Sequence, residues 1–351
     1  MSTVRIGMVG AGAVAARHLR TLLAMDGVEV AAVADPALAR AKELAAEAGA
    51  PAYPNHMELL AAERLDAVYI CVPPFAHGAP ELAVIDAGLP MFVEKPVAID
   101  QETATTIATR LAGRPLVTCT GYHWRWLDIF DRAAALLAGR PPRLVQCSWL
   151  DKVPPPPWWL RRDGSGGQTI EQTTHVLDTA RGLAGDVVEV HAFATRAAST
   201  PTHPGSVGEA ALPGADIHDV SVASLRFASG AVGTVASTCL LPRLQRAGVQ
   251  VVADGLSLEL SETELLVEVD GRRDAWTAGA DPRPRPDRDF VAAVRGGENR
   301  IRVPWPEAYR THLLACAITR SADEGRPLPV GREGPGEPQE GAPVGRGGEG
   351  G

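Results

Sequence analysis

Residues 4–15 are Val4-Arg5-Ile6-Gly7-Met8-Val9-Gly10-Ala11-Gly12-Ala13-Val14-Ala15, and this stretch decides the fold class of the chain. Residues 4–9 form the short apolar run of a buried strand, and leucines at helical spacing follow the glycines. A strand, a tight turn and a helix in this order predict a β-α unit of a parallel sheet. The G-x-G-x-x-A turn lets a backbone approach a pyrophosphate at a helix N-terminus, although the pattern alone is weak.

The next predicted strand, residues 28–34, ends at Asp35, about 20 residues beyond the glycine turn, as in dinucleotide-binding units. A carboxylate there accepts hydrogen bonds from ribose hydroxyls and repels a 2′-phosphate, so NAD is favoured over NADP. The alternative for Asp35 is a helix N-cap before Pro36. The predicted cofactor contacts of this unit are Gly10, Gly12, Ala13, Val14 and Asp35.

Strands and helices continue to alternate up to residue 121, which predicts a doubly wound parallel sheet. The remaining strands are expected at 51–53, 67–72, 91–93 and 115–120, and the helices at 36–48, 57–63, 80–87 and 101–111. Residues 1–121 are therefore predicted to form a dinucleotide-binding domain.

Two of the predicted strands end in proline-containing turns with a polar residue nearby. Lys95 follows an apolar run and precedes Pro96, which cannot donate to a sheet ladder, so the lysine is expected at the carboxyl tip of its strand. Ligands bind at such tips in open α/β sheets, and we expect His77 and Lys95 to face one crevice. The alternative is a lysine that reaches water along its own stem. The predicted cofactor contacts here are Val72, Pro73, Pro74, His77, Glu94 and Lys95.

From residue 143 the pattern changes to consecutive strands, expected at 143–150, 187–196, 219–227, 232–240, 248–253, 256–260 and 264–269. Short turns and alternating apolar residues predict an α+β domain, residues 122–330, with a large and mostly antiparallel open sheet. Its exposed face is a predicted surface for a homodimer or homotetramer. Helices are expected at 287–295 and 306–324, a surface loop at 199–215, and a disordered glycine-rich tail at 331–351.

A predicted helix spanning residues 166–181 carries Glu171, His175 and Asp178 at i, i+4 and i+7, which places them on one stripe. Such a stripe suits a helix that lines a cleft, and the alternative is an ordinary solvated pair of Glu171 with His175. No zinc pattern of sufficient ligands is present, so no metal is expected. Before this helix, Trp158, Trp159, Arg161 and Arg162 are candidates for a cleft mouth. The alternative is that the tryptophans are core or domain-interface anchors and the arginines are solvated.

The overall charge and the cysteines exclude several classes of protein. With a net charge of -8 and no basic stripe, the chain is not expected to bind nucleic acid. Five scattered cysteines predict reduced thiols. No apolar run has the length of a membrane span and the first residues do not resemble a signal peptide, so a cytoplasmic protein without membrane contact is expected.

Five segments in order resemble the glucose-fructose oxidoreductase, inositol dehydrogenase and rhizopine-catabolism (Gfo/Idh/MocA) oxidoreductases. They are residues 10–15, 71–77, 94–96, Gly121-Tyr122-His123-Trp124-Arg125, and Gly166-Gly167 leading to His175-Val176-Leu177-Asp178. The resemblance implies a Rossmann domain followed by an α+β domain, with Lys95 on the reacting oxygen and His175 as acid/base. The family helix usually carries an aspartate where this chain has Glu171.

The expected function is therefore NAD-dependent hydride transfer to or from a secondary alcohol or ketone of a sugar, cyclitol or related polyol. Lys95 and His175 are the predicted catalytic residues, assisted by Glu171, and the predicted substrate contacts are Tyr122, Arg125, Trp158, Trp159, Arg161 and Asp178. The alternatives are a keto-sugar reductase that uses NAD(P)H, a non-catalytic nicotinamide-binding sensor and a carbohydrate-binding module.

Overall fold

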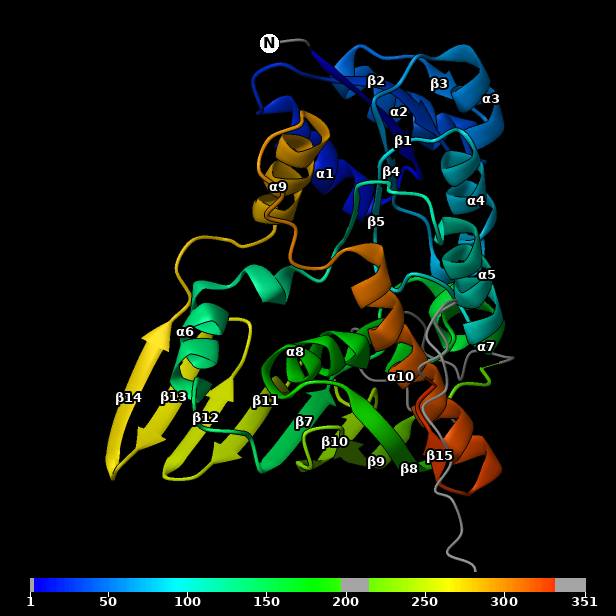
Figure 1. Ribbon diagram of the computed structural model, residues 1–351. Helices are drawn as coiled ribbons and strands as arrows, with labels where there is room; N and C mark the ends of the chain where they lie inside the picture. Colours follow the sequence, from blue (N-terminus) through cyan, green and yellow to red (C-terminus); the bar gives the residue numbers. More distant parts are fainter. Residues whose placement is uncertain (1–2, 197–214, 332–351) are drawn as a thin grey trace, which may run out of the picture.

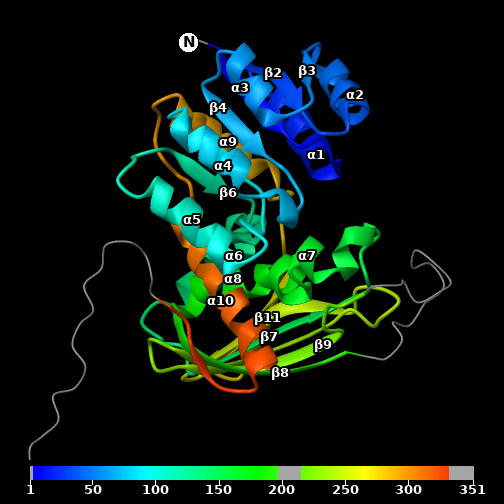
Figure 2. The ribbon, with the colours of Figure 1, turned by 90° about the vertical axis from the view of Figure 1, so that its right-hand side faces the viewer.

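The computed structural model describes residues 3–196 and 215–331, and it contains two sheets with helices between and around them (Figures 1 and 2). Apart from their end residues 215 and 331, the predicted loop at 199–215 and the predicted tail at 331–351 lie outside the described residues. The predicted α/β fold class, a parallel sheet followed by a mostly antiparallel one, is confirmed.

The first sheet is parallel throughout and has the spatial order β3-β2-β1-β4-β5-β6. Strand order reverses between β1 and β4, which is where doubly wound sheets form their ligand crevice. The strands are β1 (Val4–Val9), β2 (Val28–Ala34), β3 (Ala52–Tyr53), β4 (Ala67–Ile70), β5 (Met91–Val93) and β6 (Thr118–Thr120).

The helices of this half follow the predicted alternation. They are α1 (Ala13–Leu23), α2 (Leu38–Ala48), α3 (His56–Ala62), α4 (Ala79–Asp86) and α5 (Gln101–Leu111), with a 3₁₀ turn η1 (Pro74–Ala76) after β4. Asn55 and Asp100 accept hydrogen bonds from backbone N–H groups of the helices that follow them. The second helix begins at Leu38 with Ala37 as its N-cap, so Asp35 is not the N-cap that the alternative required.

The second sheet has nine strands in the order β14-β13-β12-β11-β7-β10-β9-β8-β15, and only its β7–β10 pair is parallel. Its strands are β7 (Leu144–Leu150), β8 (Val187–Thr195), β9 (Val220–Phe227), β10 (Val232–Thr238), β11 (Arg246–Ala253), β12 (Leu256–Leu260), β13 (Glu264–Val269), β14 (Arg272–Thr277) and β15 (Leu328–Pro329). Strand β14 was not predicted, because five of its six residues are exposed and no apolar alternation marks it.

One face of the second sheet is covered by α6 (Asp128–Leu137), α8 (Thr174–Ala184) and α10 (Trp305–Glu324), whereas no helix lies on the other face in Figure 2. Helix α6 was also not predicted, although Ile129, Phe130, Ala133 and Leu137 form its buried side. A short turn η2 (His123–Trp126) follows β6 and leads into this half, and the short segments η3 (Pro157–Leu160), α7 (Arg162–Ser165) and η4 (Thr169–Thr173) lie between β7 and α8.

The C-terminal helices join the two halves. Helix α9 (Pro284–Val294) packs beside α1 (Figure 1), and its Phe290 belongs to the core of the first sheet. Helix α10 begins in the same core with Trp305 and continues into the core of the second sheet with Ile318. The two sheets are therefore held together by buried apolar contacts along one 20-residue helix. Within residues 3–196 and 215–331, no helix has the length and apolar character needed to cross a membrane.

Candidate functional site

The glycine turn between β1 and α1 shows two different needs for glycine. Gly10 has a φ of +98°, and a Cβ at that position would lie 2.3 Å from the carbonyl oxygen of Cys71, so the fold itself requires glycine. A Cβ on Gly12 would meet no atom within 4 Å. Gly12 is also the N-cap of α1, whose first turn carries no acidic residue. The space above this helix N-terminus therefore fits an anion such as a pyrophosphate.

Asp35 lies at the carboxyl end of β2, next to that space. One carboxylate oxygen accepts a hydrogen bond from the backbone N–H of Ala11 at 2.9 Å, and the other accepts from Ala37 at 2.8 Å. These bonds fix the carboxylate beside the glycine turn while each oxygen keeps acceptor capacity. The orientation fits the predicted contact with ribose hydroxyls.

The turn after β4 contains the predicted contacts Val72, Pro73, Pro74 and His77. Val72 and Pro73 are partly exposed beside the switch point, so they remain candidates for packing against a cofactor. The His77 side chain is fully buried and its Nδ1 lies 2.6 Å from Glu81 on α4. The expectation that His77 faces an open crevice with Lys95 is therefore wrong, because its imidazole holds the start of α4 together with Glu81.

Glu94 is buried in a network that connects the two halves of the chain. Its Oε1 lies 2.8 Å from His18 Nε2 and 3.2 Å from an Arg17 guanidinium nitrogen, and His18 Nδ1 lies 2.7 Å from Asp287 of α9. Burial raises the pKa of Glu94, but the hydrogen bond and charge of His18 outweigh it and leave the pKa below its usual value. Glu94 Oε2 also accepts a hydrogen bond from the backbone N–H of Lys95 at 3.1 Å, so Glu94 orders the tip of β5.

Lys95 follows β5 at its carboxyl tip, as predicted, and it reaches across to the second half of the chain. Its Nζ donates to the Glu171 side chain at 2.7 Å and to the Glu171 backbone carbonyl at 2.8 Å. The second carboxylate oxygen of Glu171 accepts from Trp159 Nε1 at 2.7 Å. The lysine and glutamate side chains each keep 16% exposure, so Lys95 is oriented by two acceptors rather than free in water.

The predicted stripe of Glu171, His175 and Asp178 does not form, because residues 169–173 make a π-helical turn before α8 begins. A π-turn adds a residue to the helical repeat, so the i, i+4 spacing of a regular α-helix does not apply between Glu171 and His175. Asp178 is fully buried and accepts from Arg125 at 2.8 Å and from Thr311 at 3.0 Å. Asp178 and Arg125 therefore join α8, η2 and α10, and neither is placed as a substrate contact.

His175 lies among aromatic rings, 5.6 Å from Trp149 and 5.3 Å from His123 between ring centroids. Burial lowers its pKa well below the usual value, and the nearby charges of Lys95, His123 and Arg17 lower it further. Its Nδ1 is buried without a hydrogen-bond partner in the described part of the chain. A neutral imidazole near the Lys95 ammonium is suited to accept a proton.

The other predicted substrate contacts divide between core and surface. Tyr122 is buried with its hydroxyl 2.7 Å from that of Thr174, and Trp159 is fully buried. Trp158 is partly buried and meets exposed Phe75 of the first half edge-on, at 6.2 Å between ring centroids. Arg161 is exposed and pairs with Asp163. Trp158 and Tyr122 thus contact both halves of the chain, Trp158 at the surface and Tyr122 in the core.

Two residues beside His175 are not among the site residues predicted from the sequence. Trp149 of β7 and His123 of η2 flank His175, and His123 Nε2 lies 3.0 Å from Glu262 in the turn between β12 and β13. The Trp149 Nε1 is buried without a partner among residues 3–196 and 215–331. His123 lies in the segment 121–125, one of the five that resemble the oxidoreductase family. Trp149 lies in a strand whose sequence contains no motif that indicates a functional residue. In the same residues, no group of three or more His, Cys, Asp or Glu side chains is placed to hold a metal ion.

Two family models match the chain over well more than half of its length. Residues 4–122 match a model described as "Oxidoreductase family, NAD-binding Rossmann fold", and residues 139–259 match the "GFO/IDH/MocA C-terminal domain".

Characterised relatives align with parts of the chain. Myo-inositol 2-dehydrogenase of Thermotoga maritima is 26% identical over 236 residues, which are 66% of this chain and 67% of that protein. Rhizopine catabolism protein MocA of Rhizobium meliloti is 31% identical over 189 residues, 53% of this chain and 58% of that protein. The chain thus matches about two thirds or less of the length of these relatives.

Solved structures resemble the chain over nearly its full length. A levoglucosan dehydrogenase in complex with NADH has a TM-score of 0.80 at 19% identity and covers 94% of this chain and 100% of its own. The WlbA dehydrogenase from Bordetella pertussis, in complex with NADH and UDP-GlcNAcA, has a TM-score of 0.78 at 21% identity and covers 93% and 98%. At these identities the likeness establishes the fold.

Proposed function

The chain belongs to the GFO/IDH/MocA family of NAD-binding oxidoreductases, and on that premise we propose that it transfers a hydride between NAD and a secondary alcohol or ketone of a cyclitol, sugar or related polyol. The observation that carries this proposal is the approach of Lys95, from the first half of the chain, to Glu171 of the segment that leads into the His175 helix. The relatives named as inositol dehydrogenases favour a cyclitol or sugar among the alcohols.

The residues at the first sheet fit the cofactor. The N-terminus of α1 at Gly12 would hold the pyrophosphate, and Asp35 would hold a ribose. Because Asp35 is anionic and fixed by two backbone N–H groups, a 2′-phosphate at that ribose would be repelled. Bound nicotinamide supplies the hydride acceptor or donor.

Lys95 and His175 would share the work on the reacting oxygen. The Lys95 ammonium donates a hydrogen bond to that oxygen and stabilises the negative charge that develops as the proton leaves. His175, held neutral by burial and by the positive charge of Lys95, accepts the proton in the oxidising direction and returns it in the reducing direction. Glu171 keeps the Lys95 ammonium in position through its side chain and its backbone carbonyl.

The test is a screen of inositols, sugars and sugar acids with NAD and NADP, followed by variants on the best substrate in both directions. Lys95→Ala is expected to lower kcat by about 100-fold or more while the Kd for NAD stays within about two-fold. The matched control is Lys42→Ala, an exposed lysine on α2, which should retain full activity. Full turnover by Lys95→Ala would refute the assigned mechanism, and absence of NAD binding would refute the function.

The pH profile distinguishes the role of His175. Because its pKa lies well below the usual value, kcat/KM for oxidation should remain high at neutral pH and fall only at acid pH, where the imidazole becomes protonated. In His175→Gln the rate should drop by about 100-fold and this acid limb should disappear. An unchanged acid limb in the variant would assign the titration to another group.

A further inference from the structure

His175 is carried by α8 without a hydrogen bond that would orient its ring. Its Nδ1 is buried and has no hydrogen-bond partner among residues 3–196 and 215–331. In catalytic sites the second ring nitrogen of a histidine usually bonds to a carboxylate or a carbonyl, which fixes the ring. Asp178, the next acid along α8, is occupied by Arg125 and Thr311, which donate to its two oxygens. The orientation of the His175 ring must therefore come from packing.

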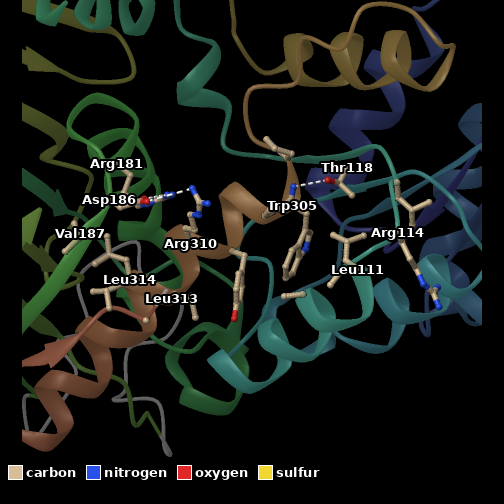
Figure 3. A pocket seen from close by; sticks show the side chains of 18 of the residues that line it. Leu111, Arg114, Thr118, Arg181, Asp186, Val187, Trp305, Arg310, Leu313 and Leu314 are labelled. Carbon is tan, nitrogen blue, oxygen red and sulfur yellow. Dashed lines mark hydrogen bonds and ion pairs between the residues drawn. The ribbon is translucent and has the colours of Figure 1, made fainter. Parts of the chain in front are cut away.

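The helix that carries His175 is itself held firmly. Near its end, in the wall of a pocket that α8 forms with α5 and α10, Arg181 pairs with Asp186 (Figure 3). The same guanidinium donates to Thr311 Oγ1 of α10 at 2.7 Å. Near its start the helix packs on β7, where Cys147 Sγ lies 3.9 Å from a backbone carbonyl of α8. The backbone is thus fixed, and only the side-chain torsions of His175 remain to be determined.

Four aromatic rings surround the His175 imidazole. Trp149 and Trp124 lie nearly parallel to it, at interplanar angles of 21° and 22° and with ring centroids 5.6 and 6.3 Å away. His123 and Tyr122 lie edge-on, at 71° and 79° and with ring centroids 5.3 and 6.0 Å away. Rotation of the imidazole about its Cβ–Cγ bond would push it against these rings, so in a close-packed site they determine its plane.

Trp149 is the partly exposed one of the two parallel rings. Trp124 is only 2% exposed, whereas Trp149 is partly buried. The residues opposite Trp149 on the neighbouring strands are small, Ser237 on β10 and Ala247 on β11, and they leave room for the indole on this face of the sheet. Because Trp149 itself reaches solvent, its removal would let water approach the side of His175 that the indole covers.

The charges around His175 favour its neutral form. Burial is the main cause of its lowered pKa, and nearby positive charges lower the pKa further. These charged neighbours are three basic groups and the acids bonded to the first two of them: Lys95, His123, Arg17, Glu171 and Glu262. Since both acids are engaged with other partners, a dry environment is the main means of keeping the imidazole neutral.

On the premise of the proposed hydride transfer, we propose that Trp149 is a positioning residue of the reaction. Its indole fixes the ring plane of His175 and keeps water away from it, so that the imidazole meets the substrate hydroxyl as a dry base. The indole thereby takes the place of the carboxylate that orients the histidine in many catalytic sites. A flat ring at position 149 fulfils this role, whereas an aliphatic or a small side chain does not.

The first test is structural and requires no substrate. Crystal structures of the full-length protein are compared for the parent, Trp149→Phe and Trp149→Ala. In Trp149→Ala we expect a changed or second orientation of the His175 ring and an ordered water against it, whereas Trp149→Phe should keep the parent orientation without that water. If Trp149→Ala does not fold, Trp149→Leu decides, because it keeps apolar volume but lacks the flat ring that holds the imidazole.

The second test is kinetic and uses the best substrate of the screen. Trp149→Ala should lower kcat at least about ten-fold, while the Kd for NAD stays within about two-fold and Trp149→Phe stays within about three-fold of the parent. The acid limb of kcat/KM should move to higher pH in Trp149→Ala, because water at the ring favours the imidazolium. The control is Trp276→Leu on β14, where the tryptophan packs with Arg132, and it should keep the kcat and the pH profile of the parent.

The two tests separate this proposal from the proposed function. An unchanged and dry His175 ring in Trp149→Ala would overturn the proposal, and so would a variant that is merely less stable but keeps the parent kcat and acid limb. If the ring is displaced in the variant but the parent turns over no substrate, the proposed function fails, whereas the packing of His175 by Trp149 is supported.

Discussion

The buried histidine His18 should make the stability of the protein depend on pH in the alkaline range. Burial alone lowers its pKa, but the charge and hydrogen bond of Asp287, together with those of Glu94, raise the pKa to about 9. The folded chain therefore binds this proton more tightly than the unfolded chain, in which the pKa is near 6.5. The resulting stabilisation is fully present below pH 6.5 and is lost as the pH rises through 9.

The size of the effect follows from the shift. A rise from 6.5 to about 9 corresponds to about 3 kcal/mol, and linkage places about 2 kcal/mol of the loss between pH 7 and pH 9. His18→Gln removes this titrating group, so the loss of stability between pH 7 and pH 8 should vanish, whereas the buried cysteines, whose pKa values burial raises, still contribute a loss as the pH approaches 9. The variant also leaves Asp287 buried without its cation and Glu94 with Arg17 alone, which should lower the stability at pH 7 by about 3 kcal/mol.

The assay is urea unfolding at pH 7, 8 and 9, compared for the parent, His18→Gln and a control, His312→Gln. His312 is buried as well, but burial lowers its pKa to about 4, so its titration lies below the tested range. The control should keep the alkaline slope of the parent even if it is less stable. A parent stability that is flat from pH 7 to pH 8, or a loss over that range that is unchanged in His18→Gln, would refute this account of the network.

Two other predictions concern the cofactor turn and the open face of the second sheet. Gly12→Val should weaken NAD binding at least about ten-fold in calorimetry with little loss of stability, because its side chain enters only the space assigned to the pyrophosphate. Gly10→Ala should instead lower the stability of the fold by about 2 kcal/mol, measured by thermal melting. An unchanged NAD affinity in Gly12→Val would contradict the placement of the cofactor. The predicted homodimer or homotetramer would bury the cross-strand pair Phe193 and Val222, which are 66% and 47% exposed in the single chain. Replacing both by aspartate should give a monomer in light scattering, while exposed Leu244→Asp should not, and a parent that is already monomeric would exclude this surface.

The first half of the chain could be predicted because its signals are local. The apolar run at residues 4–9, the glycines after it and Asp35 at the next strand end lie within one β-α-β unit, where spacing determines geometry. Lys95 could likewise be placed at a strand tip, because Pro96 ends the ladder directly after it. For these residues the sequence neighbours are also the structural neighbours.

The second half was harder because its decisive contacts are remote in sequence. The sequence places Asp178 on a cleft-lining stripe, whereas in the fold it is buried and accepts hydrogen bonds from Arg125 and Thr311, which are 53 and 133 positions away. The predicted stripe on the 166–181 helix also depends on a regular α-helical repeat, which the π-turn at residues 169–173 interrupts. Edge strand β14 lacks the apolar alternation on which strand prediction relies.

Glu171 shows how the departure from the family-typical aspartate is accommodated. Its two oxygens are each 2.7 Å from a donor, Lys95 on one side and Trp159 on the other. An aspartate at the same backbone position is one methylene shorter and would fail to reach at least one of these donors without movement of the turn. Trp159 would then be left with an unpaired buried N–H, at a cost of about 1–3 kcal/mol. The longer acid, the π-turn and the buried tryptophan therefore form one unit, and together they hold the Lys95 ammonium in its place at the tip of β5.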